Sequence, residues 1–403
     1  MNLLKEGIEN HTVQKTTLTR KLTVDGITKA YPVYRIRLDQ LFYNDQNDRI
    51  ATWISKYKTE HDGQMPDIAD RAAFNDVIEQ FIIESNPDAI KRTQNNIELV
   101  DQREPGVVLT DGRIIDGNRR FTCLRRLSQK NDRFSYFEAV ILDRNIDQNA
   151  KEIKRLELSI QHGEESKVDY NPIDRLVGVY NDVIESGMFT VKEYADATNE
   201  TESDVNKRVE VAKLMIEFLE FINAPKQFFI ARDLQISFYL EELSKLKNKC
   251  KTEDEYEELK LSVFNNIIMQ PTGDLGRYIR SLKTIIGSDY QTEFFEEQRE
   301  LAEKTLEKLP PVGKVTVQTI RDDIRSDESL ADEMKRSVEK VTTKVKKNET
   351  RNRPIQLAEK ATSFLEDIDA NIIDKMNDSE LKRMSRQLDR LEEVIAELRE
   401  HLA

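Results

Sequence analysis

Two adjacent arginines open a short helix in a segment that is suited to holding an anion, Asp111 to Leu127 (DGRIIDGNRRFTCLRRL). Its Asp-Gly pairs supply the positive-φ residue that tight turns need, and Asn118 is a suitable residue at the start of a helix. Arg119 and Arg120 then fall in the first turn, where the helix dipole already carries partial positive charge. Cations placed there usually hold an anion. Free backbone N–H groups, Gly117 and two guanidinium groups make a candidate phosphate site.

The same arginines also have a purely structural interpretation. Arg119, Arg120, Arg125 and Arg126 can be solvated surface charges on a helix whose apolar side packs into a core. The elements on either side of the segment therefore decide how much weight the phosphate site deserves.

Composition bounds the class of protein. At 403 residues, with 38% hydrophobic and 34% charged residues, the chain is expected to be helix-rich and to form two or three domains. No apolar run approaches the roughly 18 residues of a membrane span, and the first residues do not resemble a signal peptide. Cys123 and Cys250 lack disulfide or zinc-site spacing, which fits a reducing cytoplasm, and the four histidines are scattered. A net charge of −13 argues against non-specific coating of nucleic acid, so DNA binding would have to use one local face.

Apolar periodicity predicts the elements that would position the arginine segment. We expect a half-buried strand at 31–41, a helix opening at Arg49, a helix at 72–84, strand character at 97–109, a hairpin around Asp111-Gly112, a strand at 137–142 and helices at 151–161 and after Asn171-Pro172. The expected elements thus alternate between strands and helices.

A pair of helices with a short turn is predicted at 190–214. Thr190 is the expected cap of the first helix, and apolar residues recur at helical spacing in the second. If this pair is a DNA-binding helix-turn-helix, the residues facing the groove are Ser203, Asn206, Lys207 and Arg208. The alternative is a helix pair that only packs, because several acidic residues share the same surface.

The C-terminus carries a heptad pattern. Its apolar residues step by three and four over three heptads, at Leu381, Met384, Leu388, Leu391, Ile395, Leu398 and Leu402. So narrow a stripe suits one partner helix, either the same helix of a second chain or the 355–373 helix of the same chain. We expect a hairpin that also forms a homodimer through 381–402.

The arginine segment resembles the Gly-Glu-Arg-Arg box of the ParB/sulfiredoxin superfamily. A strand, a polar loop and Arg49 precede it, Gln161 and Asn171-Pro172 follow it, and the helix pair comes next, in the order found in ParB proteins. The resemblance covers about residues 30–215. It implies a small mixed sheet with helices, a nucleotide or phosphate pocket and, in many members, DNA binding. Carried over residue by residue, it assigns phosphate binding to Arg49, Gly117, Asn118, Arg119, Arg120 and Gln161.

The chain also departs from the superfamily pattern. Asn118 replaces the usual glutamate of the arginine box, Leu158-Ser159 replaces a Glu-Asn pair, and His162 replaces an arginine. In the nucleotide-hydrolysing partition proteins these groups are associated with the metal ion and the γ-phosphate. We therefore expect phosphate binding with slow or absent hydrolysis.

The resulting expectation is an α+β chain of three parts. These are a ParB/sulfiredoxin-like domain at 1–165, a helical domain with the helix-turn-helix at 166–290, and a charged linker with a helical hairpin or coiled coil at 291–403.

Three functions remain open. The first is a cytoplasmic, ParB-like protein of a plasmid, phage or mobile element, which binds DNA and responds to CTP or ATP with or without Mg²⁺. The second is a nucleotide hydrolase or nuclease of a defence or DNA-modification system, with Asp116 and Glu164 as the candidate catalytic carboxylates. The third is a scaffold that has kept the fold and lost both activities.

Overall fold

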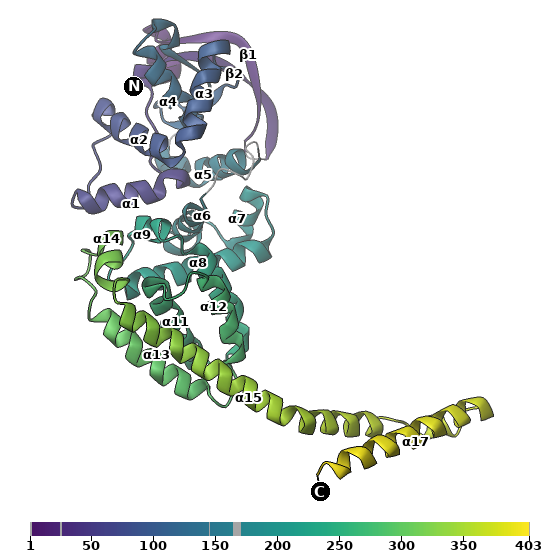
Figure 1. The fold of residues 1–403 in the computed structure, drawn as a ribbon. Helices are drawn as coiled ribbons and strands as arrows, with labels where there is room; N and C mark the ends of the chain where they lie inside the picture. The colour runs from purple at the N-terminus through teal and green to yellow at the C-terminus, as the bar shows by residue number, and fades with distance from the viewer. Residues whose placement is uncertain (1, 25, 145, 164–170, 403) are drawn as a thin grey trace. The chain divides into compact units, whose positions relative to one another are not determined.

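A five-stranded mixed sheet near the N-terminus is followed by helices in the computed structural model, which describes residues 2–24, 26–144, 146–163 and 171–402 (Figure 1). The predicted α+β class is confirmed. The chain divides into two compact units, Met1–Val338 and Glu339–Ala403. The sheet and the candidate site both belong to the first unit.

The strands are β1 (Val13–Val24), β2 (Ile27–Arg37), β3 (Gly106–Leu109), β4 (Ile114–Asp116) and β5 (Tyr136–Leu142). The helices are α1 (Ala51–Glu60), α2 (Arg71–Ser85), α3 (Pro87–Val100), α4 (Asn118–Ser128), α5 (Ile146–Gly163), α6 (Pro172–Val179), α7 (Val191–Thr198), α8 (Glu202–Phe221), α9 (Phe228–Asp233), α10 (Ser237–Leu246), α11 (Glu253–Met269), α12 (Leu275–Ser281), α13 (Gln291–Leu306), α14 (Val317–Thr319), α15 (Glu328–Glu366), α16 (Ala370–Ile373) and α17 (Asp378–Glu400). Two short helical turns, η3 (Asp48–Ile50) and η6 (Tyr180–Glu185), carry residues of interest.

The strand order is β1-β2-β5-β3-β4. Strands β3 and β5 run parallel, and the other neighbours are antiparallel. The outer pair, β1 and β2, is a long hairpin, and only Val33–Arg37 of β2 pairs with β5. The rest of the hairpin therefore extends past the remainder of the sheet as a two-stranded ribbon.

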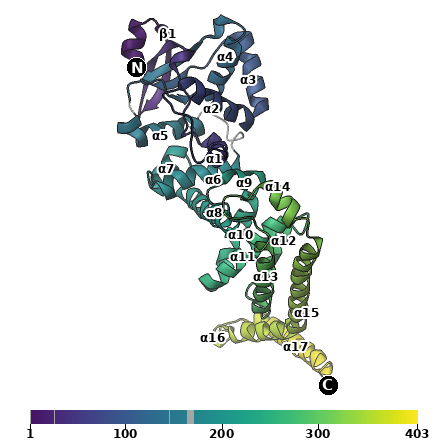
Figure 2. The same ribbon diagram turned by 90° about the vertical axis from the view of Figure 1, so that its left-hand side faces the viewer.

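Each face of the sheet is covered by different helices (Figures 1 and 2). One face packs against α2, α3 and α4 through Ile36, Val108 and Phe137, and the other packs against α5 through Val33, Val107 and Val140. Side chains on a strand alternate between faces, so successive residues of β3 and β5 serve both cores. The arginine segment joins the sheet to the helices of one face, because β4 ends at Asp116 and α4 begins at Asn118.

Most of the predicted elements are present, with two differences. Residues 97–100 belong to α3 and not to a strand, because Ile90 and Ile97 lie seven residues apart on the buried side of a helix that Asn86 caps and Pro87 begins. The strand at 106–109 is confirmed. Strand β1 was not predicted, since only two of its twelve residues, Val13 and Leu22, are buried.

Local capping explains where the helices after the sheet begin. The Asn171 side chain accepts a hydrogen bond from the Ile173 N–H at the start of α6, and Thr190 forms a capping box with Glu193 at the start of α7. Asn199, in the left-handed conformation, ends α7, and Thr201 caps α8. The starts of α6 and α7 were both predicted.

The second unit carries the C-terminal heptads on α17. Here Leu381, Leu388 and Ile395 each expose more than 40% of their surface. The end of α15 leaves Ile355 and Phe364 exposed as well. In the described chain, no helix has the length and apolar character that a membrane crossing requires.

Candidate functional site

The predicted phosphate site lies at the start of α4. Gly117 is the N-cap residue, with φ of 100°, and no side chain of the described residues caps the helix. A Cβ atom at this position would lie 2.8 Å from Phe137 Cζ and 3.2 Å from Arg120 Nη2. Glycine is therefore required both for the backbone conformation and for space. The first backbone N–H groups of α4 are left for an anion.

A cavity of about 260 Å³ opens in front of this helix terminus. Its lining includes every residue that the sequence assigned to the phosphate site, namely Arg49, Gly117, Asn118, Arg119, Arg120 and Gln161. Asp116, one of the two candidate catalytic carboxylates, lines it as well. Arg49 comes from η3, Gln161 from α5 and the others from the β4–α4 junction. Residues more than a hundred positions apart in the sequence thus converge on one cavity, here called the arginine pocket.

Asp116 is held between two guanidinium groups. Its Oδ2 accepts from Arg20 Nη1 at 2.8 Å and from Arg120 Nη2 at 3.0 Å. Arg20 also donates to the Pro105 carbonyl at 2.6 Å. A carboxylate with two cationic donors is suited to fixing Arg120 at the pocket and less suited to acting as a base or metal ligand.

Asn118 and Gln161 differ in how their polar atoms are satisfied. Asn118 is 9% exposed, and its Oδ1 has no hydrogen-bond partner among the described residues. Gln161 Nε2 donates to Glu157 at 3.0 Å, and Glu157 also accepts from Asn44 at 3.2 Å. The Asn118 carbonyl is therefore available for a donor on a ligand, such as a hydroxyl or amino group.

The opposite wall of the arginine pocket comes from residues that the sequence did not single out. Ser85, Thr93 and Asn96 provide polar groups from α2 and α3, and Ile82 and Ile97 provide apolar surface. Arg103 lies exposed at the rim. The helical pattern of Ile90 and Ile97 was the signal that would have placed Thr93 and Asn96 on a helix wall.

Of the residues that depart from the superfamily motif, Asn118 lines the pocket, whereas Leu158 and Ser159 are not among its lining residues. Leu158 is fully buried in an apolar cluster with α7, and the Ser159 hydroxyl donates to the Leu156 carbonyl. Glu164 lies outside the described residues. Within the described part of the chain, no group of three His, Cys, Asp or Glu side chains is arranged to hold a metal ion.

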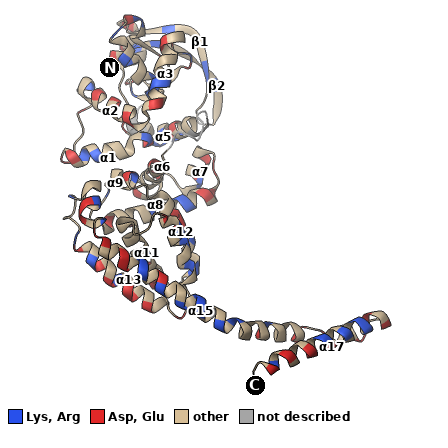
Figure 3. Ribbon diagram, in the orientation of Figure 1, with Lys and Arg blue, Asp and Glu red and all other residues tan. Residues whose placement is uncertain are grey.

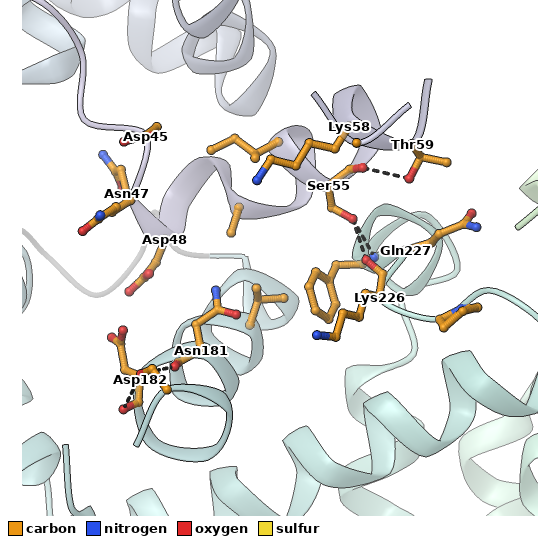
Figure 4. A pocket seen from close by; sticks show the side chains of 18 of the residues that line it. Asp45, Asn47, Asp48, Ser55, Lys58, Thr59, Asn181, Asp182, Lys226 and Gln227 are labelled. Carbon is orange, nitrogen blue, oxygen red and sulfur yellow. Dashed lines mark hydrogen bonds between the residues drawn. The ribbon is translucent and has the colours of Figure 1, made fainter. Parts of the chain in front are cut away.

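A second cavity, of about 780 Å³, lies between α1, η6 and the segment before α9 (Figure 4). At one end Asp48 and Asp182 point toward each other, and Lys58 and Lys226 lie at the other. The ammonium of Lys154 contacts three carboxylates at the acidic end: Asp48 at 2.8 Å, and Glu157 and Asp182 at 3.8 Å each. All four side chains are less than 10% exposed.

Burial dominates the acid–base properties of this charge cluster. It raises the pKa of Glu157 to about 7, opposed by the Lys154 charge, and it also raises the pKa of Asp182. Although burial alone would lower the pKa of Lys154, the carboxylates around it raise that pKa. The cluster joins η3 and α5 to η6, so it ties the sheet-containing part of the first unit to the helices that follow.

The predicted DNA-facing residues lie at the start of α8. Ser203, Asn206 and Lys207 are exposed, and Lys207 pairs with Asp204 at 3.2 Å. Arg208 is mostly buried and makes two hydrogen bonds to Glu200, at 2.7 and 2.8 Å. Arg208 therefore fixes the turn between α7 and α8, while the other three residues face solvent.

No protein-family model matches this chain, and no curated protein matches its sequence. Among solved structures, a Pnob8-like ParB-N domain matches 68% of this chain and 97% of its own length, with 13% sequence identity and a TM-score of 0.32. Similarity at this level identifies no family.

Proposed function

We propose that this chain is a ParB-like protein that binds a nucleoside triphosphate, CTP or ATP, in the arginine pocket and changes its interaction with DNA in response. The observation that supports the proposal best is the convergence of Arg49, Arg119 and Arg120 on an uncapped helix terminus. Guanidinium groups and free backbone N–H groups are the donors that phosphates favour. The resemblance of the residue pattern to ParB motifs supports the ParB-like part of the proposal.

The polarity of the arginine pocket suggests how a nucleotide would lie. The phosphates would occupy the end with the arginines, and the nucleoside would reach the wall formed by Thr93, Asn96 and Ile97. A magnesium ion would then be held chiefly by the phosphate oxygens, with water completing its coordination. Hydrolysis would be slow or absent, because Leu158 and Ser159 occupy the positions of acidic and amide groups.

Titration of the purified chain with CTP, ATP and GTP, with and without magnesium, tests nucleotide binding directly. Arg119→Ala removes a charge-assisted contact of about 1.5–3 kcal/mol, so the Kd should rise about 10- to 100-fold. Arg126→Ala is the matched control, since Arg126 lies on the same helix but outside the pocket. Equal affinities of the two variants and the unmodified chain would contradict the proposal.

DNA binding through α8 is the second part of the proposal. What supports it is the exposure of Ser203, Asn206 and Lys207 at the start of a helix that follows a tight turn. Lys207→Ala should weaken binding to duplex DNA, whereas Lys213→Ala on the same helix should not. The two lysines are matched, because each pairs with an acidic residue three positions earlier.

A further inference from the structure

We infer that the β1–β2 hairpin is a cationic ribbon that binds duplex DNA. The inference concerns a different surface from α8 and does not depend on nucleotide binding, and it shares with the proposed function only DNA as a partner. The β1–β2 ribbon is defined as residues 13–24 and 26–37.

Charge is the first observation. Residues 13–37 contain six Lys or Arg and one acidic residue, Asp25, in a chain where acidic residues outnumber basic ones by 75 to 62. Asp25 lies outside the described residues. Figure 3 shows basic positions along β1 and β2, and neither strand contains an acidic residue. Such a local reversal of charge gives an acidic protein one surface that attracts a polyanion.

The state of each cation is the second observation. Arg20 pairs with Asp116, and Arg37 pairs with Asp39 at 2.5 Å. The Arg35 guanidinium lies over the Tyr136 ring, 4.2 Å from its centre. Lys15, Lys21 and Lys29 are exposed and, among the described residues, have no carboxylate partner within ion-pair distance. These three ammonium groups can approach phosphates without breaking an ion pair within the described chain.

The geometry of the hairpin is the third observation. Leu22, Val24 and Tyr31 pack toward α5, which anchors one face of the ribbon. The opposite face is open and carries Lys15, Lys21 and small polar side chains at Thr19, Thr23 and Thr28. Lys29 pairs with Leu22 in the hairpin and so projects from the α5 side, where its ammonium lies 4.8 Å from the centre of the Tyr31 ring. A two-stranded antiparallel ribbon has the width that the major groove of B-DNA admits.

Duplex DNA fits these features better than an anionic membrane does. Lysine and threonine side chains are common donors to the sugar–phosphate backbone. A membrane-binding surface instead needs a contiguous apolar face, and the open face of the ribbon carries hydroxyl groups.

The test is fluorescence anisotropy with a labelled 30-base-pair duplex and the full-length chain, at several salt concentrations. In the triple variant Lys15→Gln, Lys21→Gln and Lys29→Gln, affinity should fall at least tenfold at 0.1 M salt. The slope of log K against log salt should shrink by about 0.9 for each phosphate that the variant no longer neutralises.

The matched control is the triple variant Lys245→Gln, Lys247→Gln and Lys249→Gln. It removes the same charge from three exposed lysines, two of which lie beside carboxylates of Glu242 and Glu253. Its DNA affinity should stay within about twofold of the unmodified chain.

Lysines on an edge strand also oppose pairing with strands of other molecules, so the Gln variant loses some protection against aggregation. Arginine at the three positions keeps both charge and edge protection, so the Lys→Arg triple variant should bind DNA normally. Light scattering identifies any loss of binding in the Gln variant that is caused by aggregation.

Four outcomes would overturn the inference. One is an unmodified chain with no salt-dependent DNA binding, and another is a Gln variant that binds as tightly as its control. The third is a Gln variant that loses binding to phosphatidylserine vesicles but not to DNA. If Lys207→Ala alone removes binding, α8 is the DNA surface and the ribbon is not. The reverse pattern supports the ribbon and contradicts the role of α8.

Discussion

At the scale of single residues, one carboxylate, Asp116, holds Arg120 at the arginine pocket. Asp116 neutralises Arg20 and Arg120, with its side chain 12% exposed. Because Asp116 directly precedes Gly117, one short segment supplies both the uncapped start of α4 and the carboxylate that orients Arg120.

Replacing Asp116 by Asn should therefore destabilise the fold. The change leaves two partly buried guanidinium groups without their carboxylate, at a cost of about 2–3 kcal/mol in the free energy of unfolding. Asp76→Asn is the control, because Asp76 pairs with Arg125 but is 72% exposed, and exposed pairs contribute about 1 kcal/mol or less. Urea denaturation measures both variants. Equal losses would show that the Asp116 pairs are no stronger than a surface ion pair.

A second prediction at this scale concerns the substitution of Gly117. Gly117→Ala should cost more than Gly63→Ala, because both glycines have positive φ but only the former would place its Cβ within 3 Å of another atom. The backbone cost alone is about 1 kcal/mol in each case. A thermal denaturation series that ranks the two variants equally would remove the steric argument.

The residue types of the candidate phosphate site could be recognised from the sequence, whereas their partners could not. The arginine pair beside a glycine is a local pattern, so the location of the pocket followed from it. Arg20 is 96 residues from Asp116 and belongs to a strand with little apolar periodicity. Contacts of that kind depend on strand pairing, which local sequence does not encode.

At the scale of elements, the charge cluster around Lys154 makes the junction of η3, α5 and η6 sensitive to pH. Burial raises the pKa of Glu157 from 4.5 to about 7. The folded state then binds a proton more tightly than the unfolded chain does. The contribution of Glu157 to stability is present below pH 4.5 and is lost as the pH rises to about 7.

The free energy of unfolding should consequently fall between about pH 5 and pH 7, and Glu157→Gln should flatten that fall. The relevant readout is the slope against pH, because the substitution also alters the hydrogen bonds from Asn44 and Gln161. Glu152→Gln, an exposed position on the same helix, should keep the slope of the unmodified chain. Parallel slopes for both variants would show that Glu157 does not titrate in this range.

Elements with clear apolar periodicity or a favourable helix N-cap were predicted correctly, and elements without either were not. The starts of α6 and α7 follow from Asn171-Pro172 and Thr190. Strand β1 was missed because its outward residues, such as lysine and threonine, give no apolar periodicity. Its strand conformation is stabilised by antiparallel pairing with β2. The sheet order places β5 between β2 and β3, a non-local arrangement that no single segment of the sequence indicates.

At the scale of the whole molecule, the exposed heptads of α17 favour assembly through a second copy of the chain. Seven apolar side chains at roughly 1.5–3 kcal/mol each would be buried in such an interface. Leu388→Asp should therefore shift the chain to a monomer at micromolar concentration, as should truncation after Arg353.

Ala396→Asp is the matched control for Leu388→Asp, since it adds the same charge to α17 outside the heptad stripe. Multi-angle light scattering distinguishes the cases. A full-length monomer before any substitution would mean that α17 does not join two chains, and a dimer that survives truncation would place the interface before residue 354.

The order of the strands also has a consequence for synthesis on the ribosome. Strand β2 emerges early, but its inner neighbour β5 pairs Glu138 with Arg35 and is translated about a hundred residues later. At a translation rate of about 5–20 residues per second, the β1–β2 hairpin waits on the order of 5–20 seconds for that partner. A nucleotide cannot stabilise the nascent chain during this interval, because Gln161 of α5 completes the arginine pocket only later still. The β1–β2 hairpin is therefore present on the nascent chain before the arginine pocket exists.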